Sequence, residues 1–338
     1  MMKTGTIRRE RLDRGIKVRT EGLYAIYSWM EIAYILVPRA VFILGLLLFP
    51  LVAPDLYWQR VLCTIGIYAL LAVSFDFLAN KVGLVCIGGA FMTGVGGYMS
   101  GILSHYYSLP PAITMPVAAL LGGFICTLVW LPCLPLRGIY FAIATFICPF
   151  LASYTILALN LWGGTNGISP IASLPNIWVE QYLIILILLL VVFGFRRLVS
   201  EDIGVVFGAL KDNDQSVLAS GINIIKMKVF ALFMASVIGC FAGAYLVHLY
   251  EYMGPSLFTL DYSILPIAAT VLGGAGSLAG PALGAIILVP LSEVLRGLGQ
   301  LRVVLYCLIL ISFILFKPEG LLSWASRKYH QFEHWVKV

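Results

Sequence analysis

Charged residues are scarce in this sequence, and this scarcity bounds its class. Only 11% of the 338 residues are Asp, Glu, Lys or Arg, whereas 61% are hydrophobic. A soluble globular domain usually carries about 25% charged residues, and so few charges cannot cover a surface that faces water. Together with a mean hydropathy of +0.97 and repeated apolar runs of about 20 residues, the scarcity predicts an integral membrane protein.

Several motifs of enzymes and cofactor-binding proteins are also missing. No G-x-x-x-x-G-K-[ST] sequence occurs, so we expect no ATP hydrolysis through a P-loop on this chain. The seven cysteines form no CxxC pair or Cys/His cluster, so neither a metal site nor a disulfide framework is expected. Residues 274–279 match the dinucleotide fingerprint G-x-G-x-x-A, but their flanks are membrane-length apolar runs rather than a soluble βαβ unit. We predict no catalytic residues and no cofactor bound by this chain.

The charges that are present are mostly basic and gather at the ends of apolar runs. The formal net charge is +6 and the sequence pI is near 8.9. In a soluble protein this balance would suggest a nucleic-acid partner, but here the positions of the basic residues favour a role in membrane orientation. We therefore expect the lipid bilayer as a partner, and no nucleic acid.

The apolar runs define a membrane region with polar segments at both ends and one inside it. Residues 1–37 form a basic arm and an interfacial segment, 38–316 a transmembrane domain, and 317–338 a tail. The polar segment 196–228 interrupts the domain. The candidate spans are 38–54, 60–79, 84–104, 112–134, 138–161, 179–195, 229–250, a Gly/Pro-broken block at 262–294, and 301–316. We predict an all-α polytopic bundle of about 8–10 transmembrane helices with Gly-broken or re-entrant segments.

The distribution of basic residues predicts the orientation of the chain. A basic arm favours the cytoplasmic side, and six spans then return the chain to the cytoplasm at 196–228, which is also rich in Lys and Arg. Two passes or a re-entrant pair across 262–294 would leave the tail inside, whereas a single pass would leave it outside. Positive-inside counting favours the first arrangement.

Glycines crowd two apolar stretches, one in each half of the chain. GxxxG spacing occurs at Gly97/Gly101, at Gly239/Gly243 and at Gly280/Gly284. Small residues let helix backbones approach closely in lipid, so tight packing is one interpretation. The other is a pair of broken helices that line a polar path, because irregular backbone survives at membrane depth only where protein or water satisfies it. The pore or helix-break candidates are Gly88, Gly89, Gly94, Gly96, Gly97, Gly273, Gly274, Gly276, Ser277 and Gly280.

Charge inside the spans is sparse. Asp76 falls late in its span and is a functional candidate, because a carboxylate is costly to bury in lipid. The alternative is that it reaches the membrane interface close to Asn80 and Lys81. His248 and Glu251 end another span, and we expect both at the interface.

The segment 196–228 carries the second signal. Its middle is typical of a short amphipathic helix that ends at Gly221. A helix held between two spans on the cytoplasmic side is either a plain connector or a lever that docks on a partner supplying energy.

Several segments, taken in order, carry a resemblance to a known family. The stretch from Gly204 to Arg296 resembles LivM-like permease subunits of branched-chain amino-acid ABC importers. The matching segments are Gly83–Phe91, Gly94–Tyr98, Gly138–Ala142, Gly163–Gly167, Ala209–Asp214, Ala219–Asn223, Lys228–Leu232, Ala242–Ala244, Pro255–Phe258, Val271–Ala285 and Phe316–Leu322. The likeness covers about residues 60–325. This chain has Asp76, Cys86 and Gly89 where the family often has Asn, Ser and a polar residue, and Val205 and Gly208 where two arginines are usual.

The resemblance implies a partner set and a role for the polar segment. The expected partners are a homologous second permease subunit, two ATP-binding subunits that hold the ATP, and a periplasmic or extracytoplasmic substrate-binding protein. The expected place is the inner (cytoplasmic) membrane of a bacterium or archaeon. In such a complex the 201–223 segment includes the coupling helix, and the Gly-rich segments help to shape the pore. The residues expected to couple to the ATPase are Ala209, Leu210, Lys211, Asp212, Asn213, Asp214, Ala219 and Gly221.

Three alternatives remain open from the sequence. An ABC permease for urea, an amide or another small polar solute fits the same features. An ion-coupled secondary transporter would need buried charges along a path, and only Asp76 is a fair candidate. An intramembrane enzyme would need a constellation of His, Ser or carboxylate groups, and none is evident.

Overall fold

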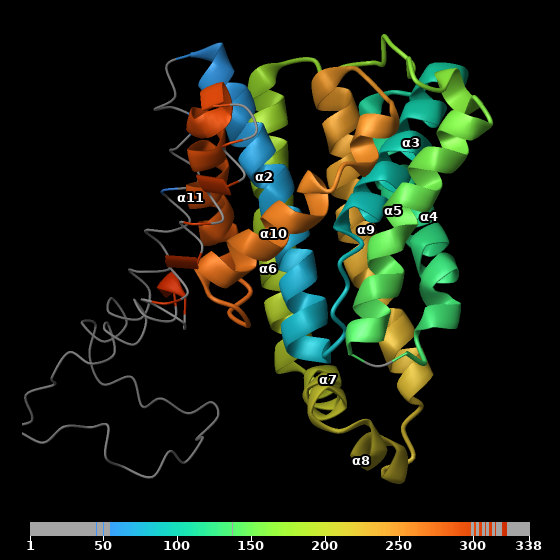
Figure 1. The fold of residues 1–338 in the computed structure, drawn as a ribbon, viewed down its shortest axis with the longest axis vertical. Coiled ribbons are helices and arrows are strands. Elements are labelled where there is room, and N and C mark those ends of the chain that lie inside the picture. The colour runs from blue at the N-terminus through green and yellow to red at the C-terminus, as the bar shows by residue number, and fades with distance from the viewer. Residues whose placement is uncertain are drawn as a thin grey trace, which may run out of the picture.

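The computed structural model describes residues 55–136 and 138–298, with isolated positions at 45, 50, 301, 304, 305, 308, 311, 312, 315 and 320–322. These residues form a bundle of α-helices, and no strand occurs within the described ranges (Figure 1). The predicted arm, the first span at 38–54, the last span at 301–316 and the tail lie wholly or mostly outside them.

Six described helical segments are long and apolar enough to cross a membrane. They are α2 (Leu56–Asp76) with its π-helical extension η2 (Phe77–Val82), α4 (Pro111–Trp130), α5 (Ile139–Ala158), α6 (Ile177–Ser200), α9 (Ile224–Tyr250), and η5 (Pro255–Phe258) with α10 (Asp261–Gly273). Two further apolar helices, α3 (Gly89–Tyr107) and α11 (Gly280–Val294), pack among them. The prediction of an all-α, multi-pass membrane protein is confirmed.

Local sequence explains where several helices begin. Pro111 starts α4, a position where the missing N–H costs nothing. The Asn223 side chain caps α9 by accepting the amide N–H of Lys226 at 3.1 Å. Large apolar side chains then follow one outward face, as at Leu120, Phe124 and Leu128 of α4, all of them exposed. A stripe of this kind is stable against lipid and unstable against water.

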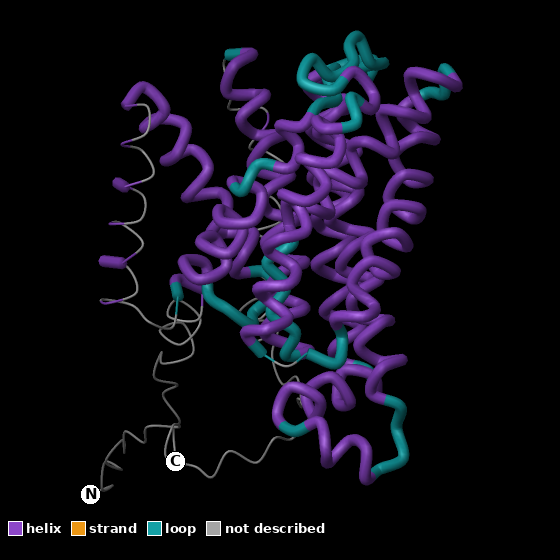
Figure 2. Tube along the Cα trace, turned by 45° about the vertical axis from the view of Figure 1, so that its right-hand side comes forward, coloured by secondary structure: helices purple, strands orange, loops and turns teal. Residues whose placement is uncertain are grey.

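The helices run alongside one another, and most connecting loops lie at the two ends (Figures 1 and 2). Figure 2 also shows non-helical stretches inside the length of the bundle. One end carries two short helices, α7 (Asp202–Asp212) and α8 (Asp214–Ala219). We call it the α7–α8 end, and the other the opposite end. The most enclosed span is α2, which packs against α6, α9, α10 and α11.

Glycines bring α3 and α9 into backbone contact. A Cβ on Gly96 would collide with the main chain of Cys240, and one on Gly243 would collide with the main chain of Thr93. Such close approach is how helices associate in lipid, where apolar burial alone drives little packing. Gly280 and Gly284 serve the same purpose between α10 and α11.

One expectation about the spans is wrong in detail. The span predicted at 84–104 begins five residues later, because residues 83–87 are not helical. The block 262–294 contains two helices joined by residues 274–279, in agreement with the predicted break, and Pro281 lies in the first turn of α11 directly after it. His248, near the end of α9, is fully buried within the bundle, where its ring nitrogens contact Ser100 Oγ, Thr114 Oγ1 and the Ala172 carbonyl at 2.6–2.9 Å.

Candidate functional site

The first break in the bundle lies between α2 and α3. The π-helix ends at Val82, and the next residue, Gly83, adopts a positive φ of 84°. Residues 83–87 then climb from the α7–α8 end toward the middle of the bundle, where α3 begins (Figure 1). The amide of Ile87 donates to Thr145 Oγ1 of α5 at 3.1 Å, which satisfies part of this irregular backbone. The break is therefore held by the surrounding helices.

A second helix begins at the same place. The amide of Ala90, in the first turn of α3, donates to the hydroxyl of Ser263, in the first turn of α10, at 2.9 Å. A Cβ on Gly89 would lie only 2.5 Å from the carbonyl oxygen of Tyr262. Two helix N-termini thus meet inside the bundle, and each contributes partial positive charge there. Asp261 adds a carboxylate to the first turn of α10.

The second break, residues 274–279, is fastened to α2 by Asp76. The Asp76 side chain is fully buried within the protein, so it is not exposed to water. Its Oδ1 accepts the amide of Gly276 at 2.6 Å, and its Oδ2 accepts the amide of Leu278 at 3.1 Å. The side-chain amide of Asn80 donates to Oδ1 at 2.8 Å. Backbone amides that converge on one anion form a cradle, and here the anion is the protein's own carboxylate.

Residues around the second break stabilise its shape. Ser277 Oγ donates to the Gly274 carbonyl and accepts the amide of Gly280, which starts α11. A Cβ on Gly320 would collide with the backbone of Gly274, so the last matched motif of the chain packs directly on this break. The conformation depends on glycine at 276, where φ is 82°.

The predicted glycines divide into two groups. Gly88 and Gly89 lie at the start of α3, and Gly273, Gly274, Gly276, Ser277 and Gly280 lie in or beside the second break. Gly94, Gly96 and Gly97 lie inside α3 and do not interrupt it, which corrects their assignment as helix-break candidates. Contact of these residues with a transported solute stays a prediction.

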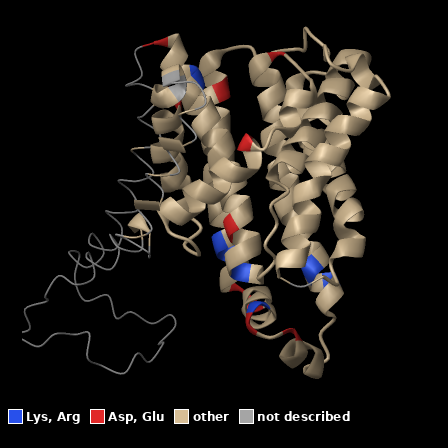
Figure 3. Cartoon of the chain, viewed as in Figure 1, with Lys and Arg blue, Asp and Glu red and all other residues tan. Residues whose placement is uncertain are grey.

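The predicted coupling segment forms two helices rather than one. Ala209, Leu210, Lys211 and Asp212 end α7, Asn213 links the helices, Asp214 and Ala219 bound α8, and Gly221 follows it. Figure 3 shows charged residues gathered at the α7–α8 end and also near the opposite end, with few between them. Of the six residues of α8, Gln215, Ser216, Leu218 and Ala219 are exposed.

The inner face of α7 contacts the first break. Phe207 is fully buried and meets Phe77 of the π-helix edge-on, with ring centroids 5.8 Å apart. Phe77 stacks in turn on Phe195 of α6 at 4.1 Å. A Cβ on Gly83 would lie 2.9 Å from Cα of Lys211, so α7 rests on the residue where the break begins. Movement of α7 therefore has a direct route to the irregular segment.

Sequence reasoning missed three residues of this site. Asp261 immediately precedes the predicted block 262–294, Ser263 lies at its start, and Thr145 lies inside the span predicted at 138–161; none of the three is among the predicted site residues. The available signal was polarity, since Asp261, Tyr262 and Ser263 precede an apolar run in the way a helix N-terminus does. Their proximity to Gly89 and Ala90 depends on tertiary packing that no local pattern encodes.

Broken helices whose ends meet inside a bundle are typical of membrane transport proteins. The fold and site thus define a multi-pass transport protein of the membrane. A family model described as "Branched-chain amino acid transport system / permease component" matches residues 57–316. The chain belongs to this family, as the sequence resemblance predicted, and is therefore a transport component.

Curated relatives agree with the family. The "High-affinity branched-chain amino acid transport system permease protein LivM" of Escherichia coli (strain K12) is 28% identical over 289 residues, covering 76% of this chain and 68% of LivM. The "Probable branched-chain amino acid transport permease protein LivM" of Methanocaldococcus jannaschii is 26% identical over 265 residues, covering 70% and 76%. No solved structure matches this chain.

Proposed function

We propose that this chain is the permease subunit of an ABC importer for branched-chain or related amino acids, and forms half of its pore. A homologous permease forms the other half, two ATP-binding subunits bind and hydrolyse ATP, and an extracytoplasmic binding protein delivers the solute. The α7–α8 end faces the cytoplasm of a bacterial or archaeal cell. The chain itself binds no cofactor.

The contact of α7 with Gly83 is the observation that carries this proposal. A helix pair on the cytoplasmic side, with exposed residues on α8 and buried contacts to a broken span, has the form of a lever. ATP-driven closure of the partner subunits displaces α7 and α8. Because α7 rests on the start of the first break, the displacement moves residues 83–88 and switches access to the pore.

The meeting point of α3 and α10 supports an amino acid as cargo. Two helix N-termini favour a carboxylate, and the Asp261 side chain favours an ammonium group. A zwitterionic solute satisfies both. Urea and simple amides lack the full charges that such a pair would recognise, and they remain the second candidate cargo.

Uptake by the complete complex tests the proposal. The chain is co-expressed with partner subunits encoded beside it, reconstituted into proteoliposomes, and supplied with radiolabelled leucine, valine or urea and with ATP. We expect ATP-dependent leucine or valine uptake that Asp261→Asn weakens more than Asp55→Asn, a change at an exposed position. Uptake that persists without ATP but collapses with the ion gradient would overturn the assignment in favour of a secondary transporter.

Deletion of residues 209–221 tests the lever. We expect the variant to insert in the membrane at the normal level and to lose ATP-dependent uptake. Preserved uptake would show that the segment is a plain connector.

A further inference from the structure

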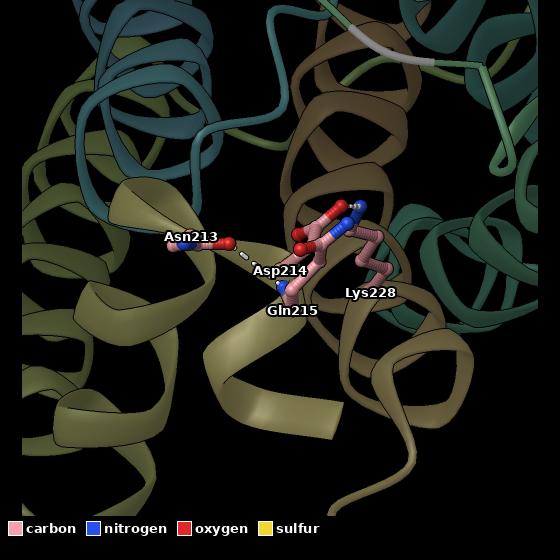
Figure 4. A network of polar contacts seen from close by, with 4 residues as sticks. All are labelled: Asn213, Asp214, Gln215 and Lys228. Carbon is pink, nitrogen blue, oxygen red and sulfur yellow. Dashed lines mark hydrogen bonds and ion pairs between the residues drawn. The ribbon is translucent and has the colours of Figure 1, made fainter. Parts of the chain in front are cut away.

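The short helix α8 is attached to the bundle at very few points. Only Val217 is fully buried among its six residues, and only Asp214 is half-buried. At six residues α8 is too short to be stable as an isolated helix, so its position depends on these attachments. The attachment at Asp214 is an ion pair with Lys228, near the start of α9 (Figure 4).

The ion pair is well enclosed and held in one geometry. Lys228 Nζ lies 3.0 Å from Asp214 Oδ2, and the two side chains are only 10% and 16% exposed. Asn213 fixes the start of α8 by accepting the amide of Gln215 at 2.9 Å (Figure 4). By contrast, the pair of Arg197 with Glu201, at the start of α7, is 72% and 50% exposed. Screening by water makes an exposed pair weak, whereas an enclosed pair constrains both partners.

Lys228 lies on α9, and α9 connects the ion pair with the place where the N-termini of α3 and α10 meet. Beyond Lys228, α9 packs on α3 through Gly243 and Cys240, where the two backbones touch. The first turn of α3 is hydrogen-bonded to α10, because the amide of Ala90 donates to the hydroxyl of Ser263. Movement of α8 is therefore transmitted through α9 to the place where α3 and α10 begin. This route is separate from the contact between α7 and Gly83.

We propose that the Asp214–Lys228 ion pair is a force-transmitting link that ties the coupling helix to α9. The inference rests on the proposed function, since it assigns positioning residues within that lever. Loss of either charge removes this ion pair between α8 and α9 and weakens the attachment of α8. Hydrolysis of ATP by the partner subunits then continues, but less of it is converted into movement of the pore.

The experiment measures uptake and ATP hydrolysis on the same reconstituted complex. We expect Asp214→Asn and Lys228→Met to lower the solute carried per ATP hydrolysed by about tenfold, with hydrolysis itself retained. The exchanged pair, Asp214→Lys with Lys228→Asp, restores opposite charges and should recover most of this ratio. Arg197→Gln removes the exposed pair from the α6 side, outside the 201–223 segment, and serves as the matched control, with an unchanged ratio.

Each outcome decides the inference. A wild-type ratio in both single variants overturns it. If a single variant fails to co-purify with the ATPase subunits, assembly of the exchanged pair is measured as well. Failure of the exchanged pair to restore either assembly or coupling also overturns the inference. Absence of ATP-driven uptake in the wild-type complex would instead contradict the proposed function. Failure of the proposed function is therefore distinguishable from failure of the ion-pair inference.

Discussion

The carboxylate of Asp76 receives the amide N–H of Gly276 at 2.6 Å, although 200 residues of chain separate them. This bond, with the parallel one from Leu278, fastens the loop between α10 and α11 to the end of α2. The first break therefore begins, and the second is held, at the same short stretch, because Gly83 follows Asp76 by less than two helical turns. The end of α2 is where the two irregular segments are held together.

Replacing Asp76 should release the second break. Asp76→Ala leaves two buried amides without acceptors, at a cost of about 1–3 kcal/mol each. Asp76→Asn retains one acceptor oxygen but turns an NH₂ group toward the amide of Leu278, so its loss should be smaller. We expect the order wild type, Asn, Ala in thermal unfolding in detergent and in uptake. Equal effects of the two variants would contradict the cradle, and Asp55→Asn serves as the control.

A side chain at position 83 should separate α7 from the first break. In Gly83→Val the new Cβ has to displace the Lys211 backbone, and the positive φ adds about 1–2 kcal/mol of backbone strain. We expect normal membrane insertion with a several-fold loss of ATP-driven uptake. Gly194→Val is the control, because a Cβ at 194 meets nothing within 4 Å. A wild-type uptake rate in Gly83→Val would remove the route from α7 to the break.

The close contact of α3 with α9 should not tolerate even one methyl group. Gly243→Ala would drive its Cβ into the backbone of Thr93, which cannot rotate away as a side chain could. Overpacking of this kind costs about 1–3 kcal/mol. We expect a clearly lower unfolding temperature in detergent for Gly243→Ala, and almost none of that shift for Gly194→Ala. Matching melting curves for the two variants would disprove the backbone contact.

The class of the fold was predictable because lipid imposes a simple rule on the sequence. Every backbone group at membrane depth needs an internal partner, so long apolar runs become helices. The two Gly-rich segments were predictable as special regions for the same reason. Which glycines break a helix was not, because Gly96 and Gly276 look alike until the neighbours are known. Gly96 faces the backbone of Cys240, whereas Gly276 turns its amide toward Asp76.

The polar contacts of the site depended on pairings between distant parts of the chain. In the sequence, Asp76 is a carboxylate near Asn80 and Lys81 that would be costly to bury. No local pattern shows that the amides of residues 276 and 278 donate hydrogen bonds to it and offset the cost of burial. The split of 201–223 into two helices was likewise hidden. The sequence Asp212-Asn213-Asp214 suits a cap as well as a helix surface, and the backbone of Asn213 settles the choice with an extended φ of −159°.

The buried network around His248 gives a prediction at the opposite end of the bundle. A carbonyl oxygen can only accept, so Nδ1–H of His248 donates to Ala172 at 2.6 Å. Nε2 then accepts a hydroxyl proton, with Ser100 Oγ at 2.8 Å and Thr114 Oγ1 at 2.9 Å. The ring thereby connects α3, α4 and α9 with the 159–176 loop.

His248→Phe keeps the volume of the ring and removes both of its polar atoms. The Ala172 carbonyl and the Ser100 hydroxyl lose this partner, and each unsatisfied group costs about 1–3 kcal/mol. We expect a lower unfolding temperature for His248→Phe and a smaller additional loss when Ser100→Ala is combined with it, because the two residues share one bond. His105→Phe is the matched control, since His105 is exposed on α3. Strictly additive effects of the 248 and 100 substitutions would show that the bond contributes nothing to stability.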